Sequence, residues 1–346
     1  MTRTLLLLIP AVLISSCDGE GSGVTLSVDP EQHRVEVRMD GELFTVYRFE
    51  PMLDKPVLFP VNAPGGIAVT RGYPLETVKG ERADHPHHVG YWLNYGDVNG
   101  YDFWNNSRAV APDRKVHYGR IVHREVLRAA VEKDTGILEV KMDWMAPDTD
   151  NPVRLLEEHT TFLFHRTGDV RIIDRITRLT AVTDTVVLGD NKEGLAAIRV
   201  ARQLELPEER PVVLTDASGR PSDSAVVDNR GVTGHYYSSR GIEGTEVWGK
   251  RAEWVRLTGQ KQGETVSIIL FDHPGNPNHP PLWHARGYGL FSVNNLGQKA
   301  YRGNLPALSR VMVKGESLTL KHRMAVVRGD PQEEEINQIF SRFSQE

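Results

Sequence analysis

Apolar and polar residues alternate with a period of two along much of this chain. Within residues 138–144, Leu, Val, Met and Trp alternate with Glu, Lys and Asp, and within residues 318–326 apolar residues and His322 alternate with Thr, Lys and Arg. Side chains two positions apart lie on the same face of a strand, so both runs predict half-buried β-strands.

Further strand patterns follow one another, separated by turn signals about every dozen residues. A succession of this kind favours a large antiparallel β-sandwich over repeated strand–helix–strand units, so the predicted fold class is all-β. The other predicted strands are residues 35–39 and 42–49 around the Asp40-Gly41 turn, 89–95, 115–127, 154–165 and 169–180 around residues 166–168, 254–258, and 265–271.

A helical pattern occurs at the end of the chain. Ile336, Ile339, Phe340 and Phe343 have helical spacing, and Asp330-Pro331 followed by acidic residues is typical of a helix start. We expect this to be the one substantial helix. Residues 207–229 are polar and proline-containing, which predicts an excursion from the core.

The first residues have the order expected of an export signal. Arg3 precedes an apolar run that is too short to span a bilayer, and Ser15, Ser16 and Cys17 follow. Residues 14–17 resemble a bacterial lipobox, which implies cleavage before Cys17 and lipidation of that residue. We therefore expect a signal peptide at 1–16, a lipidated tether at 17–23 and one β-sandwich domain at 24–346, exported and membrane-anchored only through the lipid.

Composition narrows the classes of site and partner. The chain has 346 residues, 39% of them apolar, six tryptophans and a formal net charge of −5. Cys17 is the only cysteine, so a mature domain in which it carries the lipid has no disulfide, cysteine-ligated zinc or cysteine nucleophile. There is no long basic block, which argues against nucleic acid as a partner. The oligomeric state stays open.

The stretch from Asp84 to Trp104 carries the strongest signal of a site. It places three of the chain's 13 histidines, His85, His87 and His88, within four positions, followed by carboxylates and aromatic residues. Pro86 favours an extended His85, which would put His85 and His88 on similar sides and point His87 elsewhere. Such a pair suits either acid–base chemistry or a divalent metal. The alternative is an exposed histidine-rich loop.

Two more polar clusters lie farther along. Residues 190–194 read D-N-K-E-G, and residues 272–289 contain D-H-P-G-N-P and W-H-A-R-G-Y-G. Each also has a structural interpretation, as a charged turn with a buried ion pair or as a proline-rich turn. His322 falls on the apolar face of its predicted strand, where a core histidine with satisfied hydrogen bonds is expected.

Together the motifs D-H-P-H-H-x-G-x-W-x-x-x-G-D-V-N-G-x-D-F-W, D-x-K-E-G, D-H-P-x-N and W-H-x-R-x-Y-G resemble a bacterial family labelled "methane oxygenase PmoA", also described as a domain of unknown function. The resemblance covers about residues 30–328. It implies a secreted β-sandwich protein associated with carbohydrate use, and not a genuine methane oxygenase, which is an integral membrane protein. Val89 stands where relatives often have arginine. The architecture also resembles the galactose-mutarotase supersandwiches, at the level of fold only.

The candidate chemistry is general acid–base catalysis by histidines and carboxylates. We expect Glu193 to be the base and His85, His88 or His284 the acid, with His85, His88, Glu193, His273 and His284 lining one pocket. No fixed-spacing metal motif is present, so no cofactor is predicted, although a divalent metal remains an alternative. The candidate substrate-binding residues are Asp84, His87, Trp92, Asp97, Asn99, Asp102, Trp104, Asp190, Lys192, Arg199, Asp272, His273, Trp283 and Arg286.

Two classes of function remain. One is an enzyme acting on a carbohydrate or related polyol, as a hydrolase, lyase or epimerase. The other is a non-catalytic carbohydrate-binding lipoprotein. Catalysis predicts a histidine and a carboxylate in reach of one ligand atom, whereas binding alone predicts aromatic platforms without that pairing. An oxidoreductase is less favoured because no dinucleotide fingerprint occurs.

Overall fold

The computed structural model describes residues 23–147 and 151–346. The signal-peptide and lipidation predictions, including Cys17, fall outside these residues. Nearly all regular structure is β, and every ladder between named strands is antiparallel, which confirms the predicted fold class.

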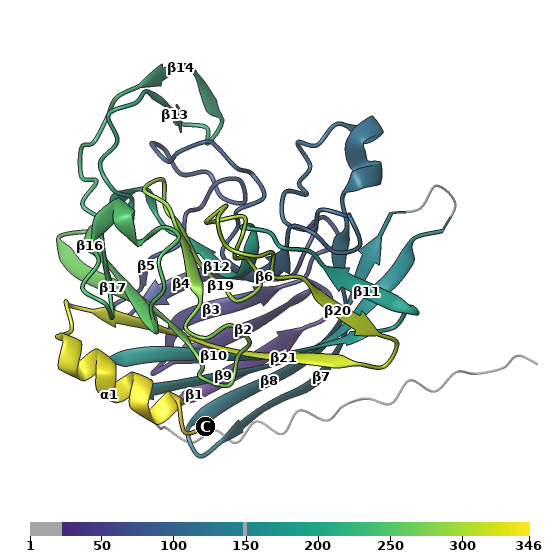
Figure 1. Ribbon diagram of the computed structural model, residues 1–346. Coiled ribbons are helices and arrows are strands. Elements are labelled where there is room, and N and C mark those ends of the chain that lie inside the picture. Colours follow the sequence, from purple (N-terminus) through teal and green to yellow (C-terminus); the bar gives the residue numbers. More distant parts are fainter. Residues whose placement is uncertain (1–22, 148–150) are drawn as a thin grey trace, which may run out of the picture.

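Two large sheets form the body of the protein (Figure 1). The nine-stranded sheet has the order β1 (Val24–Asp29), β2 (Arg34–Met39), β3 (Glu42–Arg48), β4 (Val57–Ala63), β6 (Tyr91–Tyr95), β12 (Gly194–Arg199), β19 (Leu290–Asn294), β18 (Leu282–Ala285), with β5 (Ile67–Ala68) paired to β4. The eight-stranded sheet has the order β15 (His235–Ser238), β16 (Trp254–Lys261), β17 (Glu264–Asp272), β21 (Ser317–Arg328), β10 (Val170–Ala181), β9 (Val153–Thr167), β8 (Thr135–Ala146), β7 (Arg120–Glu132).

Smaller elements decorate this body. Two short ribbons pair β11 (Thr185–Leu188) with β20 (Arg310–Val313) and β13 (Val212–Thr215) with β14 (Pro221–Val226). The β13–β14 ribbon lies at the top of Figure 1, so residues 207–229 do leave the core as predicted. Short 3-10 helices occupy Pro112–His117, Arg202–Leu204 and Gly244–Val247. The strand predicted at 115–127 is therefore wrong at its start, because Pro112 opens a helical turn and β7 begins only at Arg120.

Period-two alternation accounts for the main core between the sheets. On β8, Leu138, Val140, Met142 and Trp144 are at most 2% exposed, and they join side chains of β6, β12 and β21 in one apolar cluster. Asp40 and Gly41 both have positive φ, which suits the two-residue turn that joins β2 to β3. No helix among residues 23–147 and 151–346 is both long and apolar enough to cross a membrane.

The outer faces of the two sheets are covered differently. Helix α1 (Glu333–Phe343), at the lower left of Figure 1, packs Ile336, Ile339 and Phe343 on the outer face of the eight-stranded sheet. It is the one α-helix in the described residues, and a capping box between Gln332 and Glu335 fixes its start two residues later than Pro331. Long loops instead cover the outer face of the nine-stranded sheet, around Trp92 and Trp104.

Candidate functional site

A row of side chains crosses the outer face of the nine-stranded sheet. Trp92 on β6 pairs with Ala197 on β12, Ala197 with Ser292 on β19, and Ser292 with His284 on β18. Facing residues on neighbouring antiparallel strands project to the same side of the sheet. The register therefore brings the first and third motifs, about 190 residues apart in the chain, onto one surface.

The His85–His88 loop meets this row from the end of β6. His88 N donates to His85 O at 2.9 Å, which closes a turn around Pro86. His85 has φ +42°, so the extended conformation predicted for it is wrong. The rings of His85 and His88 nevertheless stack, with centroids 4.9 Å apart and 1° between planes, while His87 meets His88 edge-on. The predicted grouping of His85 with His88 is therefore confirmed, through a tight turn.

Buried arginines hold the loop in this shape. Arg71 donates from one guanidinium to the backbone carbonyls of Arg82, Asp84, His85 and His88 and to the Asp84 carboxylate, at 2.8 to 3.0 Å. Arg199 Nη2 donates to Asp84 Oδ1 at 2.6 Å. Burial alone would raise the pKa of Asp84, but Arg199, His85 and Arg71 hold it well below its usual range. Asp84 is thus a fixed anion beside His85.

His85 is the accessible member of the histidine cluster. Its Nδ1 lies 3.1 Å from Asp84 Oδ2, and its side chain is 39% exposed. Tyr288, in the turn between β18 and β19, stacks on the His85 ring with centroids 4.8 Å apart. The Asp84 carboxylate therefore lies on the Nδ1 side of the ring, which leaves Nε2 as the nitrogen that can act on a ligand.

His88 is placed differently from the prediction. It is 1% exposed, Trp104 Nε1 donates to its Nε2 at 3.2 Å, and Arg199 Nη1 lies 3.3 Å from its Nδ1. Both neighbours are donors, so a protonated ring would set N–H against N–H on both sides. Burial and the charges of His87 and Arg199 also lower the pKa of His88 well below its ordinary value. This burial and these contacts favour a neutral ring that supports its neighbours, and they do not favour the catalytic-acid role predicted for His88.

Glu193 and His284 form a second histidine–carboxylate pair. His284 Nδ1 donates to the Lys192 carbonyl oxygen at 3.0 Å and lies 3.6 Å from Glu193 Oε2. Tyr301 Oη and Asn294 Nδ2 donate to the same carbonyl, at 2.8 and 3.1 Å, which fixes the loop. Because Nδ1 carries the hydrogen, Nε2 carries the lone pair. Burial, Lys192 and Arg286 lower the pKa of His284 to about 3.

Glycines allow the Glu193 loop to approach β6 this closely. A side-chain carbon on Gly96 would lie 2.8 Å from Glu193 Cβ, and one on Gly194 would lie 2.5 Å from the Tyr95 ring. Gly96 N also donates to Glu193 O at 2.8 Å. These contacts explain why glycines stand in the motifs G-D-V-N-G and D-N-K-E-G.

The two pairs belong to one cluster of rings. Successive centroids are 4.9 Å apart from His85 to His88, 5.7 Å from His88 to Trp104, and 6.5 Å from Trp104 to His284. His85 is close enough to contribute to the lowered pKa of His284. The cluster reaches solvent through His85, Lys192 and Arg286, whereas Glu193 is 17% exposed at its side chain.

Several predicted ligand-binding residues instead stabilise loops. Asp102 Oδ1 accepts from the backbone N–H groups of Trp104 and Asn105, and Asp190 accepts from those of Gln298, Lys299, Ala300 and Leu308. Asp97 accepts from Gly100 N, and Asn99 bridges to Val187 N and Thr185 O. Their carboxylate and amide groups are engaged by turns, so the structure gives each of them a structural role, and the ligand-binding role stays a prediction.

The three predicted aromatic walls are closed to a ligand. Trp92, Trp104 and Trp283 are at most 1% exposed. Neighbouring residues on a strand face opposite sides, so Trp283 points into the core between the sheets while His284 points to the outer face of β18. Trp283 Nε1 donates to Ala252 O at 2.9 Å. No tryptophan among these three offers a free face for stacking on a sugar.

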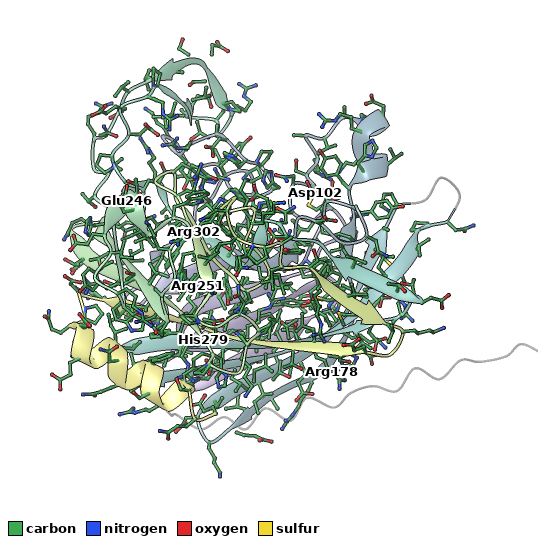
Figure 2. The ribbon with its side chains drawn as sticks, viewed as in Figure 1. Asp102, Arg178, Glu246, Arg251, His279 and Arg302 are labelled. Atoms are coloured by element: carbon green, nitrogen blue, oxygen red, sulfur yellow. The ribbon has the colours of Figure 1, made fainter. Side chains whose placement is uncertain are left out.

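Asp272 and His273 belong to another cluster, on the side of helix α1. His273 packs on Phe343 at 5.1 Å, and Asp272 Oδ2 lies 2.6 Å from His279 Nδ1. Figure 2 shows His279 well below Asp102, close to the long strands. The prediction that His273 shares a pocket with His85 is therefore wrong. His322 completes this second cluster, 1% exposed, with Nε2 at 2.9 Å from Asn295 Oδ1 and Nδ1 without a hydrogen-bond partner in the described residues. The prediction of a core histidine is therefore confirmed for its burial but not for full hydrogen bonding.

Sequence reasoning missed four residues that build the site. Arg71 and Tyr288 contact the histidine loop, and Asn294 and Tyr301 hold the Lys192 carbonyl. Tyr288 lies inside the motif W-H-A-R-G-Y-G, so its place was indicated by that motif. Within the part of the chain that the structure describes, no three His, Cys, Asp or Glu side chains are arranged to hold a metal ion.

Comparison with known proteins gives a family but no activity. A model described as "Family of unknown function (DUF6807)" matches residues 34–341. That description names no methane oxygenase, so the label in the motif resemblance stays a prediction. No curated protein matches the chain.

Solved structures with some likeness include three sugar-related proteins. The galactosidase domain of an alpha-galactosidase-sucrose kinase is 11% identical with a TM-score of 0.42, and the match covers 88% of this chain and 42% of that one. A galactose mutarotase-like protein from Clostridium acetobutylicum is 9% identical with a TM-score of 0.36, covering 88% and 98%. A putative aldose 1-epimerase from Escherichia coli K12 is 11% identical with a TM-score of 0.28, covering 88% and 99%.

Proposed function

The chain belongs to the family of unknown function DUF6807, and from the geometry of its own site we propose that it is an enzyme that transfers protons on a carbohydrate or related polyol. The observation that carries this proposal is the presence of two histidine–carboxylate pairs, Asp84–His85 and Glu193–His284, in one cluster at the surface. Carboxylates placed beside imidazoles are a recurring device of general acid–base catalysis.

The two pairs are suited to opposite tasks. His284 has its hydrogen on Nδ1, engaged by a backbone carbonyl, so its neutral Nε2 can accept a hydrogen bond from a ligand, and the neighbouring Glu193 carboxylate is the group placed to take a proton. His85, whose Nδ1 lies 3.1 Å from the Asp84 anion, is assigned the opposite task, the delivery of a proton from Nε2. In this arrangement Glu193 with His284 is the basic side and His85 the acidic side.

The cluster also supplies groups that suit hydroxyl-bearing ligands. Lys192 and Arg286 border it with charged donors, and Lys192 Nζ pairs with Glu193 Oε1, which leaves Glu193 Oε2 as an acceptor oxygen on the His284 side. Arg286 is placed over the rings of Tyr288 and Trp248, at 5.9 and 5.4 Å from their centroids, which holds its guanidinium at the edge of the cluster. A reaction of the epimerase or lyase type needs one group to remove a proton and another to return or deliver one.

Catalysis is favoured over simple sugar binding by a specific contrast. A binding module needs exposed aromatic platforms, and Trp92, Trp104 and Trp283 are buried. A proton-transfer site needs a histidine and a carboxylate in reach of one ligand atom, and the Glu193–His284 separation of 3.6 Å is compatible with that requirement. Non-catalytic carbohydrate binding is therefore the second candidate.

The proposed location is an exported, lipid-anchored one, which rests on the N-terminal sequence alone.

The test is a screen for proton exchange and product formation. The purified protein is incubated in D2O with aldoses, sugar acids and glycosides, and proton NMR follows loss of C–H signals, anomer interconversion and new products.

Once a substrate is found, Glu193→Gln and His85→Asn should each lower kcat/KM by about 100-fold or more with little change in melting temperature. Glu243→Gln is the matched control, since Glu243 pairs with His235 at 3.0 Å on the exposed surface. Full turnover in Glu193→Gln would contradict the proposal, and binding without turnover would support the second candidate.

A further inference from the structure

A separate cavity lies beside the histidine loop, next to His87. Its volume is about 480 Å³, and its walls include the apolar side chains of Leu53, Leu75 and Val89. Lys55 and His87 supply polar groups to the same wall, and Arg108 stands exposed at its border. The residues of the two catalytic pairs do not line this cavity, so it is distinct from the site described above.

Lys55 is unusual for a lysine because it is buried. It is 5% exposed, its Nζ donates to His87 O at 2.6 Å, and the ammonium lies 5.1 Å from the centroid of the Trp92 ring. Burial lowers the pKa of Lys55 to about 8, although Asp54 and Asp102 oppose the shift. The group is thus still largely charged at neutral pH.

The Lys55 ammonium lacks the partner that the other buried cations have. In the described residues seven buried arginines each lie within 4.0 Å of a carboxylate, and Lys55 does not. Its neighbour Asp54 is engaged elsewhere, 3.8 Å from Lys115 and 3.3 Å from Arg120. The seven paired residues are Arg71, Arg82, Arg171, Arg175, Arg199, Arg202 and Arg323.

A buried charge without a counter-ion is unfavourable unless something else satisfies it. The carbonyl of His87 and the face of Trp92 do so in part, and an ammonium has three hydrogens to donate. His87 Nε2 is a second unsatisfied group on the same wall, enclosed and without a hydrogen-bond partner in the described residues. The free hydrogens of Lys55 indicate a place for an acceptor that the described residues do not supply, and His87 Nε2 can donate to the same acceptor in the tautomer that carries its hydrogen there.

We propose that this cavity binds a small organic carboxylate, whose oxygens accept hydrogen bonds from Lys55 and whose apolar part packs against Leu53, Leu75 and Val89. An organic ligand fits this cavity better than a small inorganic anion does, because an inorganic anion would not contact the apolar walls. Two kinds of ligand share this chemistry, an apolar monocarboxylic acid and a sugar acid, and the experiment separates them. The site does not depend on catalysis by Glu193 and His284.

The experiment is isothermal titration calorimetry of the mature domain with matched probes. The pairs are 4-phenylbutanoate with 4-phenylbutan-1-ol, and glucuronate with glucose. At least one carboxylate should bind about tenfold or more tightly than its neutral partner, because a charge-assisted hydrogen bond is lost in the alcohol. The pair that shows this preference identifies the kind of ligand.

Lys55→Met keeps the volume of the side chain and removes the charge. It should weaken carboxylate binding about tenfold or more and leave alcohol or glucose binding unchanged. Lys141→Met is the matched control, because Lys141 is a partly exposed lysine on β8 that pairs with Glu157 at 2.8 Å. If Lys55 only fastened the loop, Lys55→Met would lower the melting temperature without changing the preference for carboxylates.

A second measurement uses the unaltered protein. Raising the pH from about 7 to about 9.5 should weaken carboxylate binding, since Lys55 loses its proton near pH 8. Three outcomes would overturn the proposal: equal affinity for acids and alcohols, undiminished acid binding in folded Lys55→Met, or no acid binding at millimolar concentration. Affinity that is constant over this pH range would also overturn it.

Discussion

Glu193 Oε2 lies 3.6 Å from His284 Nδ1, the nitrogen whose hydrogen is donated to the Lys192 carbonyl oxygen at 3.0 Å. The carboxylate and the carbonyl therefore share one imidazole edge, and the opposite nitrogen is left with its lone pair. Glu193 lies in the loop before β12 and His284 lies on β18, so the two come from different elements and different motifs. Their contact makes them one chemical unit.

The first prediction follows from that unit. Glu193→Gln and His284→Asn should each reduce kcat by about 100-fold or more, and the double variant should lose little beyond the worse single variant. Combining Glu193→Gln with the surface change Glu243→Gln should instead give independent effects. Steady-state kinetics on all variants makes the measurement. Losses that simply multiply in the Glu193–His284 double variant would show that the residues act separately.

The second prediction concerns the arginine that shapes the histidine loop. Arg71→Lys keeps the charge but loses the planar fork that bonds four carbonyls and the Asp84 carboxylate, so we expect the free energy of unfolding to fall by about 2 kcal/mol. Arg210→Lys, at an 85% exposed side chain, should leave it nearly unchanged. Urea denaturation measures both. Equal stability of Arg71→Lys and the wild type would remove Arg71 from this role.

The sequence predicted the fold where local pattern and burial agree. The alternation at 138–144 became β8, and the apolar spacing at 336–343 became α1, because each face is set by periodicity alone. The start of β7 was missed, since the period-two pattern runs on through residues that form a 3-10 turn after Pro112. Only a contact outside the segment decides between those two conformations.

The site was predicted less completely, for a related reason. The backbone of His85 is set by Arg71, which lies 14 positions earlier, so local reasoning from Pro86 gave the wrong conformation. Strand geometry alone would have separated Trp283 from His284, because neighbours on β18 face opposite sides. The D-H-P motifs that begin at Asp84 and Asp272 look alike in sequence, but their surroundings differ. Asp84 is bonded by Arg71, whereas His273 packs on Phe343 of α1.

The third prediction is a pH dependence of stability. Burial lowers the pKa of His322 to about 4, from 6.5 in an unstructured chain, so between these values the unfolded state binds a proton that the folded state does not. The stabilisation is therefore complete above about pH 6.5 and is lost as the pH falls toward 4, by about 3 kcal/mol in total.

This dependence can be isolated with one variant. Between about pH 7 and pH 4 the free energy of unfolding should fall less in His322→Gln than in the wild type. The difference between the two losses should be about 3 kcal/mol. His235→Gln, at a side chain that is 55% exposed, is the control and should follow the wild-type curve. Denaturant titrations across this range measure all three proteins. Parallel curves for the wild type and His322→Gln would contradict the prediction.

The last prediction concerns the N-terminus, where the proposal rests on residues 1–17. Lipidation needs a thioether on Cys17, and serine cannot form one. Expressed with its own signal in a Gram-negative host, the wild type should therefore partition with membranes and Cys17→Ser should not, and mass spectrometry should find a lipid mass on the wild type only. Ser16→Ala keeps the thiol beside the proposed cleavage point and should still partition with membranes. The described domain has no helix suited to crossing a membrane, so equal membrane partitioning of Cys17→Ser and the wild type would mean that something other than this lipid holds the protein there.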